Sequence, residues 1–166
     1  MKKFENAVRA AAGVVALLIV VPPSEALEKK QMTAQILKPV AVDKKLHRLI
    51  LQVNTNEPAM MNLALNNATN VAQYYNDLGE KVTIEVVTFG PGLHMLRDDT
   101  SPVKARIKAI KESTPAISFK ACGNTQENMH KVENKEIPII PEATVVKSGV
   151  VRVMELQEQG WTYVKP

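Results

Sequence analysis

Hydrophobic positions along the chain alternate between two periods, and this alternation predicts strands and helices in turn. RLILQV, residues 48–53, is a near-continuous apolar run, which is typical of a strand buried on both faces. The next segment carries apolar residues on one helical stripe, with Pro58 in its first turn and Gly79 at its end, and it predicts a long amphipathic helix. The same reasoning predicts strands over 48–53, 81–90, 116–121, part of 137–146 and 161–164, and helices over 57–78, 102–114, 124–134 and 149–159.

The order of these elements predicts an α/β fold. Helices between successive strands favour a mostly parallel, doubly wound sheet with helices on both faces, which is a three-layer α/β/α domain. In such open sheets, ligands bind beyond the carboxyl ends of the strands. Asn54, the segment 90–94 with Gly92 and His94, and Cys122 each follow a predicted strand. We therefore expect them along one edge of the sheet.

The first 26 residues follow a different pattern. Basic residues open the chain, the apolar run AAGVVALLIVV follows, and PPSEA places the small residues Ser24 and Ala26 before a cleavage position. This pattern indicates a secretory signal peptide, and the run is shorter than the roughly 20 residues of a transmembrane span. We expect cleavage after Ala26, a periplasmic location and no stable membrane insertion after cleavage; the alternative is an uncleaved anchor. Residues 27–46 have no steady period and predict a linker or N-terminal arm, and 47–166 form the expected domain.

Composition agrees with one folded domain. The chain has 166 residues, of which 45% are hydrophobic and 23% charged, enough to bury a core without disulfide or metal support. Loss of the signal removes three positive and two negative charges, which lowers the net charge from +4 to +3. Because no basic patch is interleaved with aromatic residues, we expect no nucleic-acid partner.

Cys122 is the only cysteine, so it has no partner for a disulfide within the chain. It is a packing residue, half of an interchain pair, or a reactive thiol. Gly123 allows a sharp turn after it, and Asn124 with Glu127 predicts a capping box at the start of the next helix. The thiol then lies just outside a helix N-terminus, which favours a thiolate and a lowered pKa. Lys120 is assigned to the opposite face of the strand and receives no role.

Three sequence segments together resemble the DsrE/DsrF-like sulfur-relay family. They are TFGPGLHML (88–96), FKACGNT (119–125) and SGVVRVMELQEQGWTYVKP (148–166), and they follow a strand–long helix–strand opening. The resemblance extends over 47–166. It implies an α/β/α fold with a mostly parallel sheet and a homo-oligomer, commonly a trimer or hexamer. The best-understood members have cytoplasmic relay partners, whereas this chain carries an export signal.

The resemblance also implies a chemistry. Cys122 matches the family's sulfur-accepting cysteine, which implies a persulfide that is passed to a partner thiol, and at most a sulfurtransferase-like carrier. The implied partners are a sulfur donor or acceptor protein or a small thiol, with no metal and no cofactor. The expected supporting residues are Gly123, Asn124, Thr125, His94, Gly92 and Asn54.

Two other interpretations stay open. One is a binding module without covalent chemistry, in which a small ligand at the same strand ends contacts Asn54, Gly92, His94 and Asn124. The other is a copper-handling protein that uses methionine, histidine and cysteine ligands. No close ligand spacing recurs along the chain, and Met61 falls on the core stripe of the long helix, so the copper interpretation is the weaker one.

Overall fold

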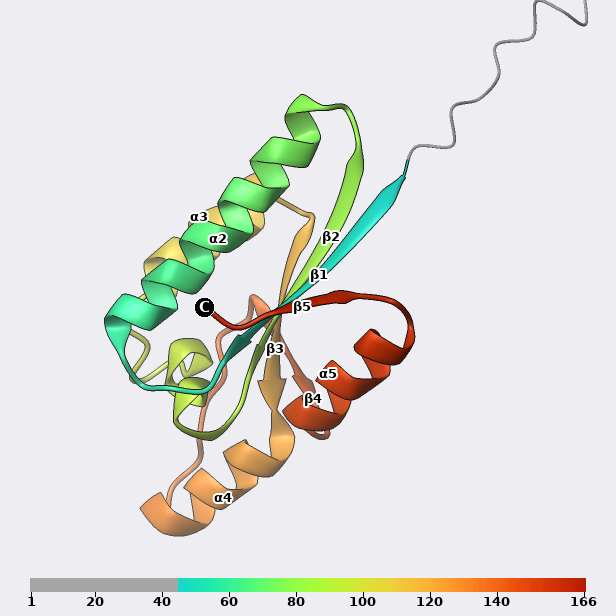
Figure 1. The fold of residues 1–166 in the computed structure, drawn as a ribbon. Helices are drawn as coiled ribbons and strands as arrows, with labels where there is room; N and C mark the ends of the chain where they lie inside the picture. Colours follow the sequence, from blue (N-terminus) through green and yellow to red (C-terminus); the bar gives the residue numbers. More distant parts are fainter. Residues whose placement is uncertain (1–44) are drawn as a thin grey trace, which may run out of the picture. The chain divides into compact units, whose positions relative to one another are not determined.

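The structure is a computed structural model that describes residues 45–166 (Figure 1). The expected signal peptide 1–26 and nearly all of the expected arm 27–46 lie outside the described residues. The described part contains a five-stranded sheet in the order β4-β3-β2-β1-β5, with every neighbouring pair parallel. Helices pack on both faces of this sheet, so the predicted three-layer α/β/α fold is confirmed.

The observed elements follow the predicted ones with shifts of a few residues. The segment 90–94, which follows the second strand, lies in a 3-10 helix. The strands are β1 (Leu46–Val53), β2 (Lys81–Thr88), β3 (Ile117–Cys122), β4 (Ala143–Val146) and β5 (Thr162–Val164), and the helices are α2 (Pro58–Asp77), η1 (Gly90–Leu96), α3 (Lys104–Ser113), α4 (Gly123–Glu133) and α5 (Gly149–Glu158).

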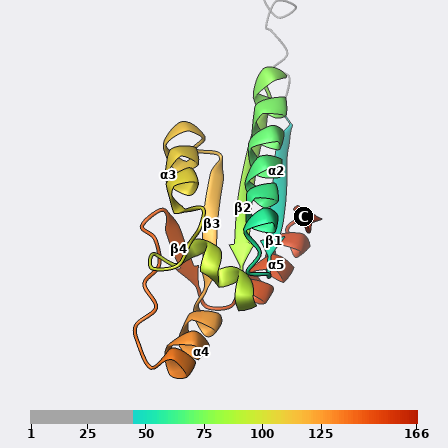
Figure 2. The same ribbon diagram turned by 90° about the vertical axis from the view of Figure 1, so that its left-hand side faces the viewer.

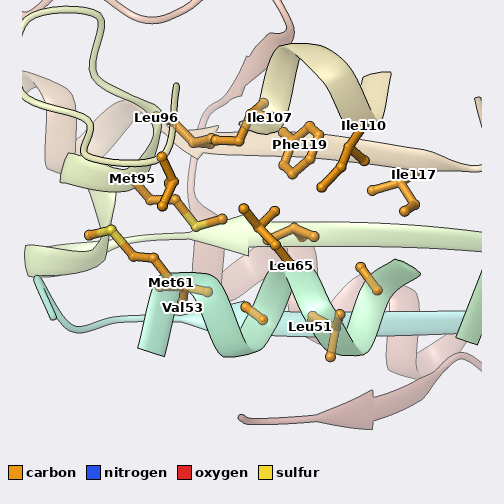
Figure 3. Packing of buried hydrophobic residues seen from close by; sticks show 14 of the residues in the cluster. Leu51, Val53, Met61, Leu65, Met95, Leu96, Ile107, Ile110, Ile117 and Phe119 are labelled. Atoms are coloured by element: carbon orange, nitrogen blue, oxygen red, sulfur yellow. The ribbon is translucent and has the colours of Figure 1, made fainter. Parts of the chain in front are cut away.

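Helices α2 and α3 cover one face of the sheet, and the main core lies beneath them (Figures 1 and 2). This core is aliphatic, with Phe119 as its one buried ring. Leu65 and Met61 enter it from α2, and Ile107 enters it from α3. Figure 3 shows these side chains meeting those of the central strands.

Helix α5 lies on the opposite face because the crossover from β4 to β5 returns to the far edge of the sheet beside β1. The cluster under α5 is small and consists of Ile50, Val87, Val153 and Leu156. A bidentate ion pair also connects α5 to this face, where Arg152 donates to both oxygens of the buried Glu85 carboxylate at 3.0 and 2.6 Å. The apolar cluster on this face is therefore smaller than the one under α2, and the face is more polar; we call it the thin face.

Helix α4 differs from the other helices because it has no buried residue. It continues from the carboxyl end of β3 and projects beyond that end of the sheet (Figure 1). Only Met129 packs partly against the main core. The first turn of α4 contacts the turn after β4, and its last residue, Glu133, binds Arg97.

Candidate functional site

Cys122 is the last residue of β3 and the N-cap of α4, with the extended backbone of an N-cap, φ −75° and ψ 116°. The predicted capping box of Asn124 and Glu127 is wrong, because the helix begins at Gly123 and Asn124 already lies inside its first turn. The cysteine sulfur therefore occupies the place of the oxygen that a serine or aspartate cap turns toward the first helical N–H groups.

The first turn of α4 is joined to the turn between β4 and α5. The N–H of Asn124 donates to the carbonyl oxygen of Lys147 at 3.1 Å. A Cβ atom at Gly123 would lie 3.1 Å from the carbonyl oxygen of Val146, which is tighter than an ordinary contact. Glycine thus allows the two segments to approach closely, and this contact brings the start of α5 to the cysteine.

The N-terminus of α5 reaches the same sulfur. Ser148 is its N-cap and Gly149 its first residue. A Cβ atom at Gly149 would lie 2.9 Å from Cδ1 of Phe89 and 3.2 Å from Cβ of Cys122, so a larger residue forces a shift. Two helix N-termini, separated by 26 residues of sequence, therefore meet at one thiol.

The environment of the thiol acts on its pKa in two directions. Burial raises the pKa of Cys122, but the Thr125 hydroxyl and the N–H groups of Gly149, Thr125 and Asn124 lower it, and the net effect is a lowered pKa. Within α4, the Cys122 side chain makes no N-cap hydrogen bond of ordinary geometry. They surround the sulfur as donors whose attraction grows when it carries a negative charge, and the positive ends of both helix dipoles add to it.

The Thr125 hydroxyl is held in place by the loop after β2. The N–H of Gly90 donates to Oγ1 of Thr125 at 3.0 Å. Because this bond uses an acceptor site of the oxygen, the hydroxyl proton stays available for the sulfur. Gly90 has a φ of +53°, in the left-handed region that favours glycine. The start of η1 after β2 and the first turn of α4 after β3 thus meet at the thiol, at the sheet edge where the sequence predicts them.

The thiol is enclosed, since Cys122 is only 4% exposed. Lys120 lies two residues earlier in the same strand, and strand side chains alternate with a period of two. Lys120 therefore lies on the same face as Cys122, and its assignment to the opposite face is wrong. The register places Val87 of β2 and Thr144 of β4 beside Lys120 on this face.

A hollow of about 390 Å³ lies between η1 and α4, on the far side of Thr125. His94 lines it, and Nδ1 of His94 pairs with the Thr100 hydroxyl at 2.8 Å. Burial lowers the pKa of His94 below its usual value, and the nearby Arg97 cation lowers it further. Cys122 does not line the hollow, whose lining is Asn56, Gly90, Pro91, His94, Thr125, Asn128, Met129, Val132 and Glu133.

Two of the expected supporting residues are placed elsewhere. Gly92 is buried against the end of β1, where a Cβ atom would lie 2.2 Å from the carbonyl oxygen of Val53, so its role is close backbone packing. Asn54 lines a separate small hollow together with Met60 and Lys165. The structure therefore places Gly123, Asn124 and Thr125 beside the sulfur. His94 does not contact the sulfur, but it lines the hollow that Thr125 also lines.

Sequence reasoning missed two residues that shape the site. The first residue is Gly149, which supplies an N–H to the sulfur. The sequence feature that could have indicated this role is that Cys122-Gly123 and Ser148-Gly149 both join a strand to a helix. The second residue is Arg97, which is 1% exposed.

The buried Arg97 guanidinium anchors the far end of α4. It donates to Asp99 at 2.9 and 2.8 Å and to both oxygens of Glu133, the last residue of α4. Its hydrogen bonds lower the pKa of Glu133 to about 2. Nothing in the local sequence signals that this arginine is buried, and its carboxylate partner Asp99 is close to it in sequence.

Within residues 45–166, no group of three or more histidine, cysteine, aspartate or glutamate side chains is arranged to hold a metal ion. In the same part of the chain, no helix is both long and apolar enough to cross a bilayer.

Comparison with known proteins gives a fold relative. No family model matches the chain, and no curated protein matches it. A solved structure of a protein of unknown function from Methanobacterium thermoautotrophicum is similar, with a TM-score of 0.61 and 25% sequence identity, over 72% of this chain and 99% of that one. The described domain thus spans essentially the whole of that protein, and the similarity supports the fold.

Proposed function

We propose that the protein is a sulfur carrier of the DsrE/DsrF type, in which Cys122 accepts sulfane sulfur as a persulfide and passes it to a partner thiol. The observation that supports this most is the convergence of two helix N-termini and the Thr125 hydroxyl on one sulfur atom. Such a set of donors favours an anionic sulfur over a neutral one. Our proposal includes export of the mature chain and a donor and acceptor outside the cytoplasm.

The chemistry is two thiolate exchanges. The Cys122 thiolate attacks the outer sulfur of a donor persulfide, R–S–SH; a new S–S bond forms, the donor S–S bond breaks, and R–S⁻ leaves. An acceptor thiolate then attacks the outer sulfur on Cys122, so that the acceptor becomes the persulfide and the Cys122 thiolate is regenerated. Sulfur moves without any external oxidant or reductant, because each step breaks one S–S bond and forms another.

The enclosing residues have a defined part in this proposal. An outer sulfur bound to Cys122 carries the negative charge one atom further out, and the N–H groups of Gly149 and Thr125 stabilise it there. Because the side chain is 4% exposed, transfer requires the starts of α4 and α5 to separate locally. Between transfers, the same enclosure limits the access of water to the persulfide.

Intact-mass spectrometry tests the proposal. The protein is incubated under native conditions with inorganic polysulfide beside the Cys122→Ser variant. We expect the native protein to gain the mass of one or more sulfur atoms, to lose it on treatment with reductant, and to transfer it to a small thiol, whereas the variant gains nothing. A Cys122 that stays unmodified when folded and reacts only after denaturation is a packing residue, and that result refutes the carrier.

One observation favours a second candidate function. The hollow between η1 and α4 is open, carries polar groups from His94 and Asn128, and is adjacent to Thr125. A small ligand held there without covalent chemistry needs no reactive thiol. If a ligand from an unbiased metabolite screen binds equally to the native protein and to Cys122→Ser, and not to His94→Ala, the binding module replaces the carrier.

A further inference from the structure

Three aromatic rings gather at the end of the sheet opposite Cys122. Figure 1 shows the start of β1 and the end of α2 at this end of the sheet, and α4 at the other. Tyr74 and Tyr75 are two of the three tyrosines in a chain with only 4% aromatic residues. The Tyr75 ring stacks on the His47 ring with the centroids 3.7 Å apart, and the Tyr74 ring meets that of Tyr75 edge to face at 5.2 Å. This surface is therefore much richer in aromatic side chains than the chain as a whole.

These rings line a hollow of about 450 Å³. Leu49, Val71 and Val82 give it an aliphatic base, since Leu49 belongs to the main core and the two valines pack against that core. Asn70 and Thr162, both exposed, add an amide and a hydroxyl. Pockets that bind small molecules have roughly this size and this combination of an apolar lining with a few polar groups.

The two tyrosine rings form a corner. One face of the Tyr75 ring is covered by His47, whose Nε2 pairs with the Glu80 carboxylate, so this ring is held in place. Tyr74 is 62% exposed, and its ring is inclined at 82° to that of Tyr75. A third ring in this corner can meet one tyrosine face to face and the other edge to face, which are the arrangements that aromatic pairs prefer. The hollow therefore favours a flat aromatic ring over a puckered aliphatic one.

A cation without an acidic partner lies at the same hollow. Arg48 lines it, is exposed, and forms no ion pair with any residue of the range 45–166. Its guanidinium Nη1 donates only a long hydrogen bond, 3.5 Å, to the carbonyl oxygen of Gln159. Strand β5 begins opposite Leu49, so in the described part of the chain no strand lies beside Arg48 at this edge of β1. The guanidinium thus complements a ligand with a negative charge.

We propose that this hollow binds a planar aromatic ring that carries one carboxylate, with the ring against Tyr74 and Tyr75 and the carboxylate toward Arg48. The site lies at the amino ends of the strands, whereas Cys122 lies at the carboxyl end of β3. It shares no residue with the hollow between η1 and α4. The proposal therefore does not depend on the sulfur chemistry of Cys122.

Amide NMR of the isotope-labelled protein, titrated with 2-naphthoate, tests this site. Two comparison compounds separate the contributions: 2-naphthol keeps the ring without the charge, and decahydro-2-naphthoate keeps the charge on a saturated ring. We expect 2-naphthoate to bind about tenfold more tightly than either compound, because it alone has both the ring and the carboxylate. The amide signals of Asn70, Val71 and Thr162 should shift, and those of Gly123 and Thr125 should not.

Variants at exposed positions test the two contacts separately. Tyr74→Leu keeps an apolar side chain without the ring and should weaken 2-naphthoate about tenfold, whereas Tyr74→Phe should bind like the native protein. Arg48→Gln should lower the affinity for 2-naphthoate to that for 2-naphthol and leave 2-naphthol unchanged. Leu63→Ala shortens another exposed side chain of α2, outside the hollow, and should bind like the native protein.

Several results overturn the proposal. Equal binding of 2-naphthoate and decahydro-2-naphthoate, or unchanged binding in Tyr74→Leu, identifies an unspecific apolar groove. Full affinity in Arg48→Gln shows that the charge has no part, and absence of binding at millimolar concentration, or shifts confined to other residues, shows that no such site exists. Circular dichroism spectra that match the native spectrum show that a variant is folded. Sulfur loading of Cys122 is measured separately by mass, so loss of one property with the other intact identifies which proposal has failed.

Discussion

The two faces of the sheet show how one domain separates stability from chemistry. Twenty buried residues form the cluster under α2 and α3, whereas four form the cluster under α5. The second face instead carries Lys120, the buried Glu85 with its partner Arg152, and Cys122. Because the first face supplies most of the apolar burial, the second can place polar groups and a thiol where they would otherwise weaken the core.

The largest expected effect comes from equivalent truncations on the two faces. Leu65→Ala removes a fully buried side chain from the main cluster, and we expect it to lower the free energy of unfolding by about 3–5 kcal/mol. Leu156→Ala removes the same atoms from the thin face, and we expect about 2 kcal/mol because fewer neighbours surround the cavity and they relax more easily. Urea unfolding measures both, and equal losses would contradict the separation of stability onto one face.

Removal of the ion pair on the thin face should have the next largest effect. Arg152→Ala leaves the Glu85 carboxylate, which is 6% exposed, without its partner. We expect a loss of about 2 kcal/mol, below the 3–5 kcal/mol of a fully buried pair because Arg152 is itself partly exposed. Glu155→Ala removes only a surface contact of Arg152 at 4.0 Å and is the matched control, with about 0–1 kcal/mol expected.

Gly149→Ala should disturb both stability and the thiol. The added Cβ meets Phe89 and Cys122 within 3.2 Å, so the start of α5 has to move away from the sulfur. We expect a loss of about 1–2 kcal/mol from overpacking and a raised pKa of Cys122, because the Gly149 N–H moves away. The pH dependence of alkylation measures the pKa. Val150→Ala, at the adjacent exposed position, should leave it unchanged, and an unaltered pKa in Gly149→Ala would exclude α5 from the site.

Thr125 provides a test on the thiol alone. Thr125→Val keeps the shape and removes the hydroxyl that lowers the pKa of Cys122, so we expect that pKa to rise and alkylation at neutral pH to slow several-fold. Thr125→Ser keeps the hydroxyl and should stay close to the native rate. If both variants react like the native protein, the bond from Gly90 to Thr125 has no bearing on the sulfur.

The smallest expected effect is a dependence of stability on pH. The pKa of Cys122 is lowered in the folded protein from its ordinary value of 9.0, so the folded state gives up the thiol proton first. The contribution is fully present above pH 9.0 and is lost as pH falls through the folded pKa. We expect the stability difference between native protein and Cys122→Ser to grow in favour of the native protein as pH rises toward 9.0. If this stability difference instead shrinks as pH rises, the pKa of Cys122 is raised on folding and the prediction is wrong.

The alternation between strand-like and helix-like hydrophobic spacing was sufficient to predict the strands and helices, and to place Cys122 at the carboxyl-end edge of the sheet. RLILQV and KVTIEVVT are apolar enough to be buried on both faces of a sheet. The long helix has a single apolar stripe, so only one of its sides can pack against that sheet. These local patterns leave few ways to arrange the strands and the helix. The start of α4 was less predictable. Asn124 has the stronger capping preference, but Gly123 fits against the turn after β4, and this tertiary contact lets the helix begin earlier.

The sequence by itself determined the α/β order, the position of Cys122 at a strand end and the adjacent helix, because these depend on residues close together in the chain. Only the tertiary structure decided what surrounds the sulfur. Gly90 with Thr125, and Gly149 with Cys122, lie 35 and 27 positions apart and meet because parallel strands end at one edge and the last crossover returns α5 across the sheet. Burial of Arg97 and exposure of Val150 and Val151 on α5 have the same origin, since each depends on which elements pack together.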